Sequence, residues 1–136
     1  MLYPTANIGA ALLRISMGSL FLAHVGIRLL FITMPVAVSY FVSIGLPGPL
    51  AYAVTATEAL VGVALILGWQ VRVMAAAGAA VLAGAAIFAH FQNGFLFTNT
   101  NGGWEYPVFW CAALIAQGLL GAGAWSLDEK LGAGPR

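Results

Sequence analysis

Charged residues are scarce in this sequence, at 7% of its 136 residues. Soluble domains carry about 25% charged residues on average, so this chain has too few charges to cover a water-exposed surface. Hydrophobic residues make up 62% of it, and the mean hydropathy is +0.97. These values exclude a soluble globular fold and predict that lipid surrounds much of the protein.

Signals for several classes of function are also missing. The net charge is +1 and no run of basic residues occurs, which excludes a nucleic-acid partner. One cysteine is present, Cys111, so neither an intramolecular disulfide nor a Cys-x-x-Cys redox motif can form. Zinc or iron–sulfur sites built from thiolates are excluded for the same reason, and no metal site is expected. No nucleotide-binding or flavin-binding motif occurs either.

Long apolar segments dominate what is present, and they predict an all-α fold: a transmembrane four-helix bundle formed by one domain, residues 1–136. The expected spans are about 8–32, 49–69, 73–91 and 105–124, because about 20 helical residues cross a hydrocarbon core of about 30 Å. No basic region precedes the first segment, so we expect it to be a retained span and not a removed signal peptide. The apolar stretch 36–43 is too short to cross, and we expect it at the interface or returning partway into the protein.

The distribution of basic residues predicts the orientation of this bundle. Four spans place both termini and the turn near residue 70 on one side, which then holds Arg72, Lys130 and Arg136, whereas the opposite side holds only Arg28. Lysine and arginine accumulate on the cytoplasmic side of membrane proteins. We therefore expect both termini in the cytoplasm.

Polar residues are predicted to gather in a layer at the opposite, outer end of the bundle. The members of this predicted layer are His24, Arg28, His90, Asn93 and Glu105. We take His24, Arg28, His90 and Glu105 as candidate catalytic residues and Asn93 as a candidate substrate-binding residue. Structural alternatives exist: Arg28 extending to lipid headgroups, a hydrogen-bonded core histidine, or Glu105 as a first-turn carboxylate favoured by the helix dipole. The convergence of all five at one depth favours a site.

Two further charges, Arg14 and Glu58, fall deeper in the predicted spans. From the helical rise, Arg14 is expected about 10 Å from the cytoplasmic surface and Glu58 about 15 Å from the outer one. An unpaired charge at mid-depth costs about 3 kcal/mol on insertion scales. We therefore predict that the two side chains face the bundle interior and form a buried ion pair, which could simply fix the register of two helices.

The first segment, LLRISMGSLFLAHVGIRLLF, carries a series of residues at helical spacing: Arg14, Gly18, Phe21, His24 and Arg28. This series resembles the first span of the DoxX family of small four-helix membrane proteins. In that family lysine is usual where Arg28 stands and glycine where Val25 stands. The segments FVSIGLPGPL, LILGWQVRVMA, AHFQNGF, NGGWEYP and LLGAGAWSLDEKL also look like the family, so the resemblance covers nearly the whole chain.

The resemblance implies a multi-pass protein of the bacterial or archaeal cytoplasmic membrane. The relatives that give the family its name are subunits of a thiosulfate:quinone oxidoreductase, and others are linked to redox stress or quinone handling. It therefore implies a membrane redox subunit that interacts with the quinone pool. If the chain is an enzyme, the resemblance implies a quinone-linked oxidoreductase. Other membrane or peripheral subunits, together with the lipid bilayer, are the expected partners.

The candidate residues suit this chemistry, although other functions remain open. Histidine titrates near neutral pH and can donate or relay protons, and Arg28 could hold an anionic substrate or a quinone oxygen. The alternative is a non-catalytic membrane anchor or accessory subunit of a larger complex, which the Gly/Ala-rich third segment suits. Haem held by His24 and His90 is disfavoured, because helical spacing alone does not place the two imidazoles face to face.

Overall fold

The computed structural model describes residues 4–132, and this part of the chain is helical without strands, which confirms the predicted all-α class. The longer segments, given in chain order, are α1 (Pro4–Ile27) with its π-helical continuation η1 (Arg28–Ile32), α3 (Leu50–Leu67), α4 (Val71–Gly84) with the π-helical η2 (Ala85–His90) and the 3-10 turn η3 (Phe91–Asn93), and α5 (Glu105–Leu120). Two shorter helices, α2 (Met34–Ser43) and α6 (Leu127–Lys130), complete the described chain.

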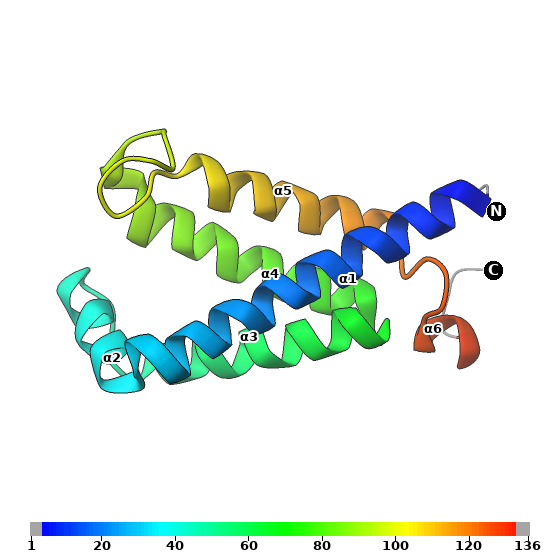
Figure 1. The fold of residues 1–136 in the computed structure, drawn as a ribbon, viewed down its shortest axis with the longest axis horizontal. Helices are drawn as coiled ribbons and strands as arrows, with labels where there is room; N and C mark the ends of the chain where they lie inside the picture. Colours follow the sequence, from blue (N-terminus) through cyan, green and yellow to red (C-terminus); the bar gives the residue numbers. More distant parts are fainter. Residues whose placement is uncertain (1–3, 133–136) are drawn as a thin grey trace.

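The long helices contact one another in a ring: α1 packs on α3, α3 on α4, α4 on α5, and α5 on α1. Figure 1 shows that the pair α1–α3 and the pair α4–α5 diverge toward the end that carries α2 and the loop after η3. The start of α1, the α3–α4 turn and α6 lie together at the other end. There the N–H of Ala124 donates to the carbonyl oxygen of Asn7, which ties the chain after α5 to the beginning of α1.

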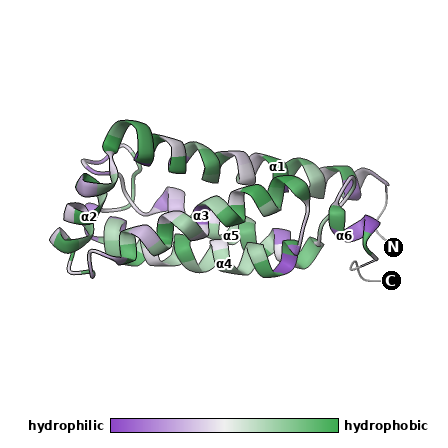
Figure 2. Cartoon of the chain, turned by 90° about the horizontal axis from the view of Figure 1, so that it is seen from below, coloured by the Kyte–Doolittle hydropathy of each residue, from purple (hydrophilic) through white to green (hydrophobic). Residues whose placement is uncertain are grey.

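Three helical segments are long and apolar enough to cross a membrane: Pro4–Ile32, Leu50–Leu67 and Val71–Asn93. Hydrophobic residues cover most of these segments, whereas α6 carries hydrophilic ones (Figure 2). The protein is therefore an integral membrane protein. Helix α5 has 16 residues, which corresponds to about 24 Å of rise, so the fourth crossing stays a prediction. The cytoplasmic side of the termini also stays a prediction, and Arg136 lies outside the described residues.

Glycines allow α1 and α3 to approach until their backbones touch. A Cβ atom added to Gly18 would lie 2.8 Å from the carbonyl oxygen of Gly62, and one added to Gly62 would lie 3.1 Å from that of Gly18. Close backbone approach at small residues is the main source of helix–helix attraction in lipid, where dispersion replaces the hydrophobic effect. Beyond this crossing, Phe21 of α1 fills the core beside Trp110 of α5, with ring centroids 4.7 Å apart.

Helix α2 is more regular than the sequence suggested for this short apolar stretch. Thr33 has a φ of 73° and ends η1, and Pro35 then occupies the first turn of α2, where its missing N–H costs no helical hydrogen bond. Helix α2 packs against α3. It thereby forms one wall of the opening between the two helix pairs.

Candidate functional site

A partly buried ion pair joins the first residue of η1 to the middle of α3, and its arginine is Arg28, not the predicted Arg14. The Nη1 atom of Arg28 donates to a carboxylate oxygen of Glu58 in a short contact and to Oγ1 of Thr55 at 2.9 Å. The side chains of Arg28 and Glu58 are 18% and 10% exposed. The hydroxyl of Thr55 donates a hydrogen bond to the carbonyl oxygen of Ala51 at 2.7 Å. This bond orients Oγ1 of Thr55 so that it can accept from Arg28.

The predicted ion pair between Arg14 and Glu58 is therefore wrong. Side chains on a helix tilt toward its N-terminus. Arg28 consequently extends back along α1 toward the middle of the bundle and reaches Glu58. Arg14 extends in the same direction, which takes it away from Glu58 and toward the end that carries α6. An estimate from depth alone suggested the wrong partner for Glu58, because it did not take the tilt of the side chains into account.

Arg14 instead caps the end of α3 and the chain that follows α5. It is 0% exposed and donates five hydrogen bonds, all to backbone carbonyls: those of Leu65, Ile66, Ala122, Ala124 and Trp125, at 2.6–3.1 Å. The carbonyls at the C-terminus of a helix lack partners within the helix and carry partial negative charge, which a cation stabilises. Arg14 is thus a structural residue at the end of the molecule opposite to Arg28.

Asp128 of α6 caps the N-terminus of the neighbouring helix α4. Its two carboxylate oxygens accept the N–H groups of Gln70 and Val71 at 2.7 and 2.9 Å, and Val71 begins α4. The N–H of Asp128 donates to Gly68 at the end of α3. The α3–α4 turn is therefore held by a carboxylate on one side and a guanidinium on the other. Sequence reasoning missed Asp128, because the Ser-Leu-Asp-Glu segment signals the N-cap of α6 by Ser126 and not a cap for α4.

A cavity of about 480 Å³ lies between α2, α3 and the α4–η2 helix, and we call it the α2–α4 cavity. Arg28, Glu58, His90 and Tyr40 supply its polar groups. Its apolar walls are formed by Phe41, Ile44, Leu46, Leu50, Val54, Ala80, Val81, Gly84, Ala85, Phe88 and Ala89. Tyr40 and Phe88 are 42% and 53% exposed, so the rim of the cavity reaches the outer surface of the helices.

His90 contributes a fixed imidazole ring to this cavity. Its Nδ1 atom lies 2.9 Å from the carbonyl oxygen of Gly102. Asn93 lies nearby but is absent from the cavity lining. Its amide donates to the carbonyls of Ala89, Asn101 and Gly102 at 2.9–3.2 Å, so it organises the loop between η3 and α5. A substrate-binding role for Asn93 stays a prediction.

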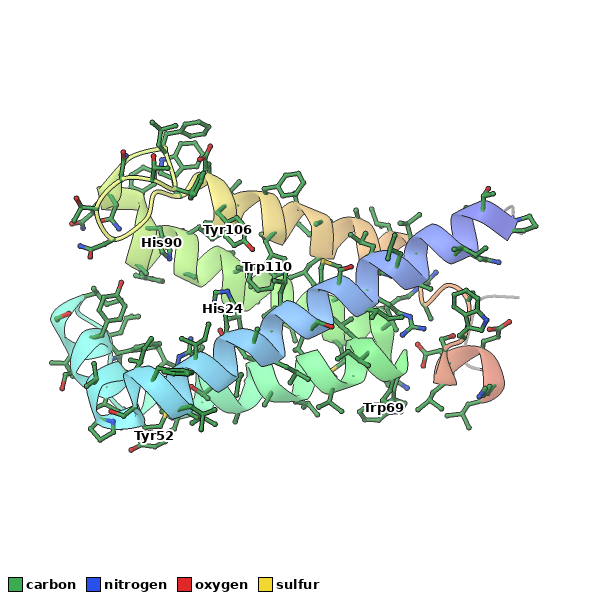
Figure 3. All side chains as sticks on the ribbon, viewed as in Figure 1. His24, Tyr52, Trp69, His90, Tyr106 and Trp110 are labelled. Carbon is green, nitrogen blue, oxygen red and sulfur yellow. The ribbon has the colours of Figure 1, made fainter. Side chains whose placement is uncertain are left out.

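Glu105 and His24 lie outside the α2–α4 cavity. Glu105 begins α5 and accepts the N–H of Phe97 at 2.9 Å, beside a separate hollow lined by Phe95, Phe97 and Trp104. His24 projects from α1 toward α5, where its ring packs on Trp110 with centroids 5.4 Å apart (Figure 3). Catalytic roles for these two residues stay predictions.

The structure thus brings together two of the predicted catalytic residues, Arg28 and His90, with Glu58 as a third polar group. The two histidines are separated: His90 lines the α2–α4 cavity, whereas the ring of His24 packs on Trp110 at a tilt of 56°. Tyr40 and Phe41, the aromatic residues of α2 that line the cavity, were missed. The usable signal was the aromatic pair in VSYFVS, adjacent to a dense turn, in a stretch too short to cross the membrane.

Two comparisons with known proteins give a match. The sequence model of the DoxX family matches residues 9–91, a region that includes Arg14, Arg28, Glu58 and His90. A protein of Bacillus subtilis (strain 168) named "Putative oxidoreductase CatD" is 31% identical over 122 residues, which cover 90% of this chain and 86% of the relative. No solved structure matches the chain.

Proposed function

Because this chain belongs to the DoxX family, we propose that it is a membrane redox subunit that binds the headgroup of a lipid quinone in the α2–α4 cavity. The observation that carries the proposal is the cavity itself, which combines apolar walls with Arg28, Glu58 and His90. Ligand sites of about 300–1,000 Å³ are usually apolar with a few convergent polar groups, and this cavity of about 480 Å³ has that character. The relative named as an oxidoreductase supports a redox role.

The charges of the cavity favour a neutral ligand. The ion pair of Arg28 with Glu58 cancels the charge of the arginine, so an anionic substrate would find no uncompensated cation there. A quinone headgroup is neutral, flat and largely apolar, and its oxygens accept hydrogen bonds. The N–H groups of Arg28 that remain beside its bonds to Glu58 and Thr55 can hold one of these oxygens.

The lining residues also provide an entry route and an orientation. Phe88 and Tyr40 at the rim are partly exposed, so a headgroup can enter sideways while its isoprenoid tail stays in lipid. A bound quinone supplies two-electron and two-proton chemistry. Arg28 would orient one of its oxygens, and the apolar walls would exclude water. We expect the exchanged electrons to come from, or pass to, another membrane or peripheral subunit in a bacterial or archaeal cytoplasmic membrane.

Photolabelling of the protein in nanodiscs tests this proposal. An azido-quinone should label residues of α2, α3 or η2, with excess decylubiquinone competing. Ala80 lines the cavity, so Ala80→Phe should lower labelling about tenfold, the equivalent of about 1.4 kcal/mol of binding free energy. Ala76 is exposed one turn earlier on α4 and does not line the cavity, so Ala76→Phe is the matched control.

Labelling outside the α2–α4 cavity, or equal labelling of the two variants, would contradict the proposal. If labelling fails and a stoichiometric subunit with its own cofactor co-purifies, the chain is better explained as an accessory subunit that anchors that partner.

A further inference from the structure

The hydrogen bond between His90 and Gly102 decides which ring nitrogen of His90 carries a hydrogen. A backbone carbonyl can only accept, so Nδ1, at 2.9 Å from the Gly102 oxygen, must be the protonated nitrogen. In the neutral imidazole, Nε2 is then bare and presents a lone pair. Within residues 4–132 the structure gives this Nε2 atom no hydrogen-bond partner, and the ring lines the α2–α4 cavity.

The loop after η3 holds this tautomer in place. Asn93 Nδ2 donates to the same Gly102 oxygen at 2.9 Å and to the Ala89 oxygen at 3.1 Å. Gly102 has a φ of +73°, and a Cβ atom there would lie 3.5 Å from Nδ1 of His90. Asn93 and Gly102 are therefore positioning residues. They fix the oxygen that selects the hydrogen on Nδ1, and they leave Nε2 as the nitrogen available to a ligand.

A second lining residue of the cavity, Arg28, presents hydrogen-bond donors. A guanidinium has five N–H groups, and three bonds from Arg28 are accounted for, one to Thr55 and two to Glu58. The remaining N–H groups can donate to a ligand. The cavity therefore offers a donor at Arg28 and an acceptor at Nε2 of His90, and the two come from different helices.

From this arrangement we infer that the α2–α4 cavity prefers the reduced, dihydroxy form of its ligand, a hydroquinone, over the quinone. One hydroxyl of a hydroquinone donates to Nε2 of His90 while its other oxygen accepts from Arg28. A quinone has only acceptor oxygens, so its carbonyl would face the lone pair of Nε2 without a hydrogen between them. This inference rests on the proposed quinone-binding function and adds the redox form that the site selects.

Binding of three matched ligands to the wild-type protein in nanodiscs tests the inference. The probes are decylubiquinone, decylubiquinol and the dimethyl ether of that hydroquinone, with binding to empty nanodiscs subtracted for each. We expect decylubiquinol to bind roughly 2- to 10-fold more tightly than decylubiquinone, the effect of one net hydrogen bond. The dimethyl ether keeps the oxygens but has no hydroxyl to donate, so it should lose this advantage.

The possible outcomes separate the inference from the function on which it rests. Equal affinities, or tighter binding of decylubiquinone, overturn the inference while quinone binding stands. A dimethyl ether that binds as tightly as decylubiquinol also overturns it, because hydroxyl donation would then be irrelevant. If none of the three probes binds above the empty nanodiscs, the proposed function itself fails.

The tautomer can be measured directly, without relying on ligand affinity. The chain has 2 histidines, so a protein labelled with ¹⁵N-histidine gives two sets of imidazole signals. The set lost in His90→Phe belongs to His90, and the set that remains in His24→Gln gives the same assignment if the first variant does not fold. We expect nitrogen shifts of the Nδ1–H form, and an Nε2 shift that moves when decylubiquinol is added. A dominant Nε2–H form would overturn the inference.

Discussion

At the scale of single residues, the two arginines of α1 show how side-chain direction decides a role. Arg14 and Arg28 both tilt toward the start of α1. Arg14 therefore contacts the carbonyls at the end of α3, and Arg28 contacts Glu58. The sequence could predict that both are buried and both need partners. It could not predict the partners of Arg14, because the carbonyls after α5 approach it only once the C-terminal segment has folded back.

Replacing Arg14 by lysine should destabilise the protein, even though the charge is kept. Lysine has three donors, whereas Arg14 makes five hydrogen bonds to carbonyls, so at least two buried acceptors lose their partner. A hydrogen bond to a charged group contributes about 1.5–3 kcal/mol, so the loss of two such bonds should cost at least about 3 kcal/mol. Unfolding in SDS, followed by tryptophan fluorescence, measures it. Arg72→Lys at an exposed position is the control, and equal stability of the two variants would refute the capping role.

At the scale of elements, one series of residues makes the main contacts of α1 and η1 with the rest of the protein. Its members are Arg14, Gly18, Phe21, His24 and Arg28. Gly18 contacts α3, Phe21 and His24 pack on Trp110 of α5, and the arginines bind at the two ends. The order of these residues along the first segment carried the resemblance to the DoxX family. It could not divide them into packing residues and cavity residues, because that division depends on where α2 and α4 lie.

Gly18→Ala should force α1 and α3 apart. The added methyl would lie 2.8 Å from the Gly62 oxygen and 3.1 Å from the Ile66 nitrogen, which are backbone atoms that cannot rotate away. Overpacking of this kind costs about 1–3 kcal/mol. Gly9→Ala on the same helix meets nothing within 4 Å and should be neutral or stabilising, by up to about 1 kcal/mol. The same SDS titration compares the two variants. A Gly18→Ala protein as stable as Gly9→Ala would contradict the close approach.

The turn between α3 and α4 offers a second comparison between glycines. Gly68 has a φ of +70°, and a Cβ atom there would lie 2.5 Å from Cβ of Ser126 and 2.9 Å from Cζ of Arg14. Gly45 has a similar φ of +84° but open space around it. Gly45→Ala should cost about 1–2 kcal/mol from backbone strain alone. Gly68→Ala should cost about 1–3 kcal/mol more, because the methyl also displaces the Arg14 cap. Equal losses in thermal stability would show that the C-terminal segment does not press on this turn.

At the scale of the whole molecule, the two ends of the bundle differ in kind. One end is closed by Arg14, Asp128 and α6, which satisfy the helix ends with charged caps. The other end diverges around the α2–α4 cavity. The sequence predicted a polar layer at that end, and Arg28 and His90 do line one cavity there. It could not predict that Asn93 and Glu105 bind loop backbone, because the fold of that loop depends on contacts distant in sequence.

This asymmetry makes the membrane orientation a test of the whole arrangement. Arg72 and Lys130 lie at the closed end, whereas Arg28 at the open end is paired with Glu58, so the excess of positive charge predicts a cytoplasmic closed end. In a Cys111→Ser background, Asn99→Cys should react with a membrane-impermeant maleimide in intact spheroplasts, and Glu129→Cys only after lysis. The reverse result would invert the orientation. Labelling of both cysteines from outside would place an even number of crossings between them, which would show that α5, at 16 residues, does not cross the membrane.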